Sequence, residues 1–144
     1  MKAFRRIASI IAVGVVIILT SCATMTIPVE NMQRVTSILT TGGSTELFDR
    51  SPKTEPFGIG DRVFFLTTLR WTDSNSGAGS HKVRWDWYSG SEIAAVVERS
   101  YNFHTTPFEL RGVILASALG PGHHKVEVFI DESLFDSREF DVQE

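Results

Sequence analysis

Few residues of this chain have both the type and the spacing that catalysis or metal binding requires. The four histidines are His81, His104, His123 and His124, and the one cysteine is Cys22. No second thiol is present for a redox pair or a thiolate metal site, and no nucleophile-elbow, phosphate-loop or His-Glu-x-x-His motif occurs. Adjacent residues on a strand point to opposite faces, so His123 and His124 cannot easily share an ion. We therefore expect no catalytic residues, metal or cofactor.

A polar strand face is the better candidate for binding. The stretch from His81 to Tyr88 alternates, and its polar side consists of Lys82, Arg84, Asp86 and Tyr88. Charged and aromatic side chains on an exposed sheet suit a carbohydrate or protein ligand. The same pattern is also typical of a solvated outer face with cross-strand ion pairs. The sequence leaves both readings open.

Tryptophans and glutamates offer weaker candidates. We expect Trp85 and Trp87 in the core, whereas Trp71, at a strand end, remains a candidate ligand contact that could stack on a sugar ring. Nothing in the spacing of the glutamates singles out a pair for glycoside hydrolysis, so we expect them to be scattered surface acids: Glu92, Glu98 and Glu109.

The N-terminus has the features of a secretory signal. Three positive residues precede a run of 13 apolar and small residues, Ile7 to Leu19. A bilayer core of about 30 Å needs about 20 residues, so this run is too short to span it and has the length of a signal h-region. It ends in Leu19, Thr20, Ser21 and Cys22.

These four residues resemble the lipobox of bacterial lipoproteins. The resemblance implies that signal peptidase II removes residues 1–21 and that Cys22, carrying diacylglycerol on its thiol, anchors the mature chain to a membrane. Residue 23 is Ala rather than Asp, which is similar to the outer-membrane sorting pattern of Gram-negative lipoproteins. We therefore expect a lipid-anchored protein of the cell envelope, at the outer membrane if the host is Gram-negative.

The charge of the mature chain excludes some partners. From Cys22 onward, 11 Lys and Arg stand against 17 Asp and Glu, a net charge of about −6. This balance argues against nucleic-acid binding and against membrane attachment through a polybasic face.

The remaining pattern predicts strands. Residues 22–31 are expected to form the lipidated N-terminus and a tether, and residues 32–144 a single domain. Gly, Pro, Asn, Asp and Ser clusters separate the strand candidates at fairly regular spacing, as in a sandwich or barrel. The candidates are residues 34–40, 61–71, 81–88, 93–101 (where a short helix is the alternative), 108–119 (kinked at Gly112), 124–130 and 134–142.

The last two candidates resemble the final hairpin of bacterial immunoglobulin-like and fibronectin-III-like domains. The matching residues are Pro121, Gly122, His124, Val126, Val128, Asp131, Phe140 and Val142. His124 stands where the family has Tyr, so a tyrosine-corner hydrogen bond is not assured. We expect the hairpin to point a polar edge outward: Lys125, Glu127, Asp136, Glu139 and Asp141.

We therefore expect an all-β protein, a single immunoglobulin-like antiparallel sandwich of about seven or eight strands. Its expected role is non-enzymatic: binding an envelope protein or glycan, or serving as an accessory subunit, through the polar face or the loops 73–80 and 102–107. The alternatives are a carbohydrate-binding module for envelope glycans and a small envelope hydrolase or metal-dependent enzyme. Fold class does not choose among these.

Overall fold

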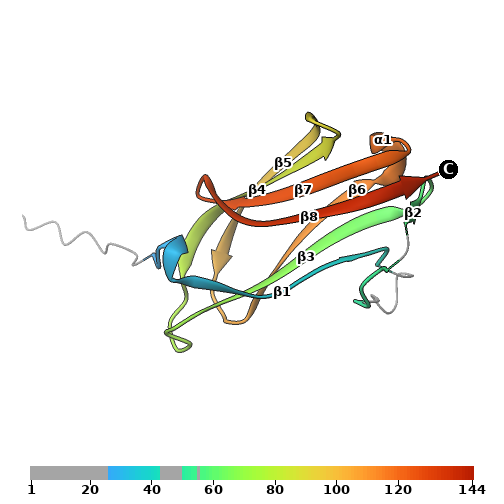
Figure 1. Cartoon of the computed structure of the whole chain (residues 1–144). Helices are drawn as coiled ribbons and strands as arrows, with labels where there is room; N and C mark the ends of the chain where they lie inside the picture. Colours follow the sequence, from blue (N-terminus) through green and yellow to red (C-terminus); the bar gives the residue numbers. More distant parts are fainter. Residues whose placement is uncertain (1–25, 43–49, 55) are drawn as a thin grey trace, which may run out of the picture.

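A computed structural model gives the structure of the protein, and it describes residues 26–42, 50–54 and 56–144 (Figure 1). The signal segment and the lipobox residues lie outside this part of the chain. The elements are η1 (Val29–Asn31), β1 (Met32–Thr40), β2 (Phe57–Gly58), β3 (Arg62–Trp71), β4 (Gly79–Ser89), β5 (Glu92–Phe103), β6 (Phe108–Leu115), α1 (Ala116–Leu119), β7 (Gly122–Ile130) and β8 (Ser133–Gln143).

The strands form two sheets packed face to face. One sheet has the order β1-β3-β6 and the other β2-β8-β7-β4-β5. All pairs are antiparallel except β2 with β8. The chain crosses between the sheets after β1, β2, β3, β5 and β6, as in a Greek-key sandwich. The prediction of an all-β, immunoglobulin-like sandwich is confirmed, and the segment 93–101 is strand rather than helix.

Alternation along the central strands builds the core. The inward side of β3, which includes Phe65 and Leu69, is buried along its whole length, and so is the apolar side of β4. A Cβ atom on Gly112 of β6 would lie 2.5 Å from Cδ1 of Trp85. At Gly112, β6 pairs with β3 without a register shift. Glycine is needed there because the indole of Trp85 packs directly on the backbone. The strand predicted over residues 108–119 is too long, because β6 ends at Leu115 and α1 follows.

The C-terminal hairpin departs from expectation at Asp136. Its carboxylate is buried, pairs with Arg34, and accepts a hydrogen bond of 3.1 Å from Oγ1 of Thr67. The expected outward position was wrong because Asp136 lies an even number of residues from Phe140 and Val142, which face the core. The carboxylate therefore connects β8 to the opposite sheet.

His124 is buried near the start of β7. It is 1% exposed, and its Nε2 lies 2.9 Å from the carbonyl oxygen of Gly120. Because the carbonyl can only accept, Nε2 carries the proton. The imidazole thus makes the bond to upstream backbone that a tyrosine hydroxyl makes in related sandwiches.

The chain enters the sandwich beside the β3–β4 loop. The N–H of Ile27 donates to the carbonyl of Ala78 at 2.8 Å, and η1 follows at once. The C-terminus lies at the opposite end, near α1 (Figure 1). No helix within residues 26–42, 50–54 and 56–144 is long and apolar enough to cross a membrane.

Candidate functional site

The polar residues predicted as a binding face, Lys82, Arg84, Asp86 and Tyr88, all lie on β4, but Asp86 is buried and the charges are already paired. Nε of Arg84 lies 3.0 Å from Asp86, and its NH1 lies 2.8 Å from Glu132. Nζ of Lys82 lies 3.0 Å from Glu98. The face therefore offers a ligand few free ionic partners.

Tyr88 is held in the same way. Its hydroxyl donates to Glu127 at 3.1 Å, and Nζ of Lys125 lies 4.3 Å from the centre of its ring. Burial raises the pKa of Tyr88, and the bond to Glu127 raises it further. Burial lowers the pKa of Arg84, but Asp86 and Glu132 outweigh this and leave it above its usual value. Neither group exchanges a proton near neutral pH.

The tryptophans do not form a stacking platform. Trp85 and Trp87 are buried in the core, as predicted. Trp71 is only 3% exposed and belongs to β3, in the other sheet, so it does not share a surface with Lys82 and Arg84. Nε1 of Trp71 donates to the carbonyl of Ser76 at 2.7 Å. Its role in the described structure is to hold the β3–β4 loop.

The histidines lie apart from one another. His104 contacts the backbone of Asn102, and His123 pairs with Asp141 at 2.8 Å on the exposed hairpin. Within the described ranges, no group of three or more His, Cys, Asp and Glu residues is placed to hold a metal ion.

His81 joins three segments at one end of the sandwich. Its Nδ1 lies 2.6 Å from Oδ2 of Asp131, and its Nε2 lies 3.0 Å from the carbonyl of Ala78, which also accepts from Ile27. Both partners of the ring are acceptors, so both bonds form together only when the ring carries two protons. His81 thus connects the entering chain, the β3–β4 loop and the β7–β8 turn.

The two loops named from the sequence converge at this end. The N–H of Ala78 donates to the carbonyl of Phe103 at 2.7 Å, and the rings of Trp71 and Phe103 stack with centres 6.2 Å apart. The β3–β4 loop (residues 72–78) and the β5–β6 loop (residues 104–107) therefore lie side by side on a rigid base. We call these two loops, with the start of β1, the loop end.

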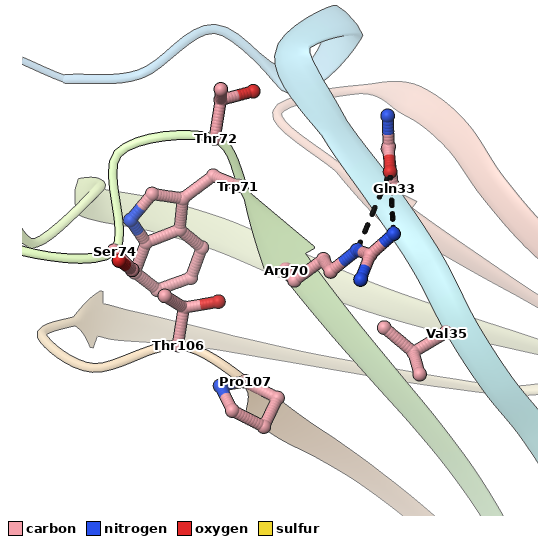
Figure 2. Close-up of a pocket in the computed structure, with 8 residues that line it drawn as sticks. All are labelled: Gln33, Val35, Arg70, Trp71, Thr72, Ser74, Thr106 and Pro107. Atoms are coloured by element: carbon pink, nitrogen blue, oxygen red, sulfur yellow. Dashed lines mark hydrogen bonds between the residues drawn. The ribbon is translucent and has the colours of Figure 1, made fainter.

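An open groove of about 530 Å³ lies in the loop end (Figure 2). Its wall includes Val35, which is 48% exposed at the irregularity in β1 between Arg34 and Thr36. The groove, which we call the loop groove, is lined by Gln33, Val35, Arg70, Trp71, Thr72, Ser74, Thr106 and Pro107.

The loop groove contains polar side chains that form no ion pair with a carboxylate in the described structure. The guanidinium of Arg70 donates two hydrogen bonds, of 3.3 and 3.4 Å, to Oε1 of Gln33 (Figure 2). Its partner is therefore a neutral amide and not a carboxylate. Oγ1 of Thr106 is buried and has no hydrogen-bond partner among the described residues. A ligand with acceptor oxygens and an apolar part would match this lining.

Sequence reasoning named the loops but missed the contribution of β1. Gln33 enters the groove because it pairs with Arg70 in the β1–β3 register. A local sequence pattern does not determine which residues of two distant strands pair. The sequence around Gln33 and Val35 therefore gave no indication that they line a groove.

No family model and no curated protein matches this chain. Among solved structures it is similar to the alkylpurine DNA glycosylase AlkC of Pseudomonas fluorescens bound to DNA containing an abasic site analog. The TM-score is 0.52 at 14% identity, over 79% of this chain and 31% of that one.

Two further likenesses are lower. A β-glucosidase from Listeria innocua in complex with glucose has a TM-score of 0.47 at 11% identity, over 78% of this chain and 16% of that one. An immunoglobulin-like protein from Pseudomonas aeruginosa has a TM-score of 0.44 at 9% identity, over 78% of this chain and 91% of that one. At such identities, likeness bears on fold alone.

Proposed function

We propose that this protein is a lipid-anchored lipoprotein of the cell envelope with a non-enzymatic binding or accessory role. Diacylglycerol on Cys22 holds it to a membrane, the outer membrane in a Gram-negative host. The loop groove is its contact site. The observation that carries the binding site is the convergence of two loops, joined by the stacked rings of Trp71 and Phe103, beside a groove lined by the guanidinium of Arg70 and the amide of Gln33.

The composition of the groove supports binding rather than catalysis. None of the described residues that line it is a histidine, cysteine, lysine or carboxylic acid, so it holds no side chain of the usual general-base types. Arg70 and Gln33 supply planar donors, and Val35 and Pro107 supply apolar contact. Another component of the envelope, with exposed oxygens beside an apolar part, is the partner that this chemistry fits.

The alternative of a carbohydrate-binding module has one supporting feature. Planar polar side chains such as Arg70 and Gln33 suit the hydroxyl pairs of a sugar ring. The two aromatic candidates named from the sequence offer no free face for stacking, because Trp71 is buried and Nζ of Lys125 lies over the ring of Tyr88. For the metal-dependent alternative, no group of three or more His, Cys, Asp and Glu residues within the described part of the chain is placed to hold an ion.

A capture experiment with matched arginine variants tests the assignment. Full-length wild type, Arg70→Gln and Arg62→Gln are extracted with their lipids as polymer-bounded discs, and the co-purifying protein, glycan and lipid are quantified. Both arginines are exposed on β3, but only Arg70 lines the groove. We expect Arg70→Gln alone to lose the associated component. Equal recovery from all three proteins would contradict binding through the groove.

A further inference from the structure

We propose that the loop end docks on the phospholipid headgroup layer, so that the sandwich stands on the membrane by this end. The proposal rests on the proposed anchor at Cys22 and names the envelope component that the loop groove meets. Three observations support it: the chain enters the fold at the loop end, few residues separate that entry point from Cys22, and the loop end exposes hydrogen-bond donors.

The chain is fixed to the loop end from Ile27 onward. The N–H of Ile27 is bonded to Ala78, whose carbonyl is also bonded to His81. Ile27 and Val29 pack against the core cluster, and Met32 is buried in it. The segment next to the anchor is therefore part of the loop end.

Very little chain separates this fixed point from Cys22. Ile27 is the fifth residue after Cys22, and five residues span at most about 18 Å when fully extended. Strand β4 has 11 residues and therefore runs about 35 Å from the loop end to the β4–β5 turn. A lipid on Cys22 thus keeps the loop end near the bilayer, and the β4–β5 turn can stay well clear of it.

The exposed groups of the loop end suit phosphate and ester oxygens. Thr72 and Ser74 present hydroxyls, and Arg70 presents a guanidinium that meets only neutral Gln33 among its recorded hydrogen bonds. The exposed carboxylate of Asp73 accepts hydrogen bonds from Oγ of Ser76 at 2.8 Å and from the N–H of Asn75 at 3.2 Å. Arginine and hydroxyl donors form charge-assisted bonds with phosphate. Docking needs the anchor, since the mature chain is negative overall.

Two serine positions make a matched pair of probes. Ser74 lies in the β3–β4 loop, and Ser91 lies in the β4–β5 turn beside the start of β7. Both are exposed. Since Cys22 is the only native cysteine and its thiol would carry the lipid, Ser74→Cys or Ser91→Cys adds the only free thiol. Each is labelled with the same environment-sensitive fluorophore, and the acylated protein is placed in phosphatidylcholine vesicles with or without headgroup spin labels.

We expect spin-labelled headgroups to quench the probe at residue 74 several-fold more than the probe at residue 91. Equal quenching, as in a sandwich lying on its side, or stronger quenching at residue 91 would overturn the docking and leave the anchor intact. The intact mass of each protein reports diacylglycerol separately. A mass without lipid would contradict the proposed function, and the docking with it.

Discussion

At the residue scale, His123 is the group whose titration the structure describes most directly. The hydrogen bond that His123 donates to Asp141, partly offset by desolvation, raises the pKa of His123 above 6.5, and Glu139 adds to the effect. The charged pair therefore favours the folded state fully below pH 6.5, and this contribution is lost as pH rises through the folded pKa. Because both partners are exposed, the effect on stability is small.

We expect Asp141→Asn to lower the pKa of His123, read by an NMR titration of its ring protons. His104, whose ring bonds to the backbone carbonyl of Asn102 and not to a carboxylate, provides reference signals in the same spectra. An unaltered His123 titration in Asp141→Asn would contradict the pairing.

Gly112 makes a second prediction at this scale. An alanine methyl would lie 2.7 Å from Nε1 of Trp85 and 2.5 Å from Cδ1, and overpacking of this kind costs about 1–3 kcal/mol. Gly60→Ala is the matched control, since nothing lies within 4 Å of its Cβ. Urea unfolding should show a lower midpoint for Gly112→Ala only. Equal midpoints would show that the indole has room to move.

At the scale of elements, Asp136 connects β8 to β1 and β3. Its carboxylate accepts from Thr67 and pairs with Arg34, whose side chain is half exposed. We expect Asp136→Ala to lower the free energy of unfolding by about 1.5–3 kcal/mol, the range for hydrogen bonds to charged groups. The loss should stay below that of a fully buried pair because Arg34 regains water.

Glu139→Ala is the control for Asp136→Ala, because Glu139 lies on the exposed side of β8. Its substitution should change the free energy of unfolding by less than about 0.5 kcal/mol. Similar losses in both variants, measured by urea unfolding, would contradict a special role for the inward carboxylate.

The elements also show how far the sequence can be read. Two-residue alternation placed Trp85 and Trp87 in the core correctly, because burial on one sheet face is a local pattern. Asp136 was misplaced because its charge was weighed above its parity with Phe140. Gln33 was not foreseen as a lining residue, since it reaches the groove only through the β1–β3 register. Local periodicity predicts which side faces inward, but the groove depends on long-range packing.

At the scale of the whole molecule, the entry point of the chain at Ile27 and the loop groove belong to one end. The N–H of Ile27 donates to the carbonyl of Ala78 in the β3–β4 loop. Two other residues of this loop, Thr72 and Ser74, line the groove. The polar outer sheet, by contrast, satisfies its charges internally. An anchored sandwich of this design would bring its groove to the membrane surface and expose its paired sheet to water.

The acylation of Cys22 is the central claim, and the intact mass of the membrane-extracted protein tests it most directly. Full-length wild type and Cys22→Ala are expressed in parallel. We predict that the wild type begins at Cys22, carries the added mass of diacylglycerol and sediments with the envelope. We predict that Cys22→Ala lacks the lipid and that no mature, lipid-carrying form of it sediments with the envelope. Identical masses and identical fractionation of the two proteins would contradict the account.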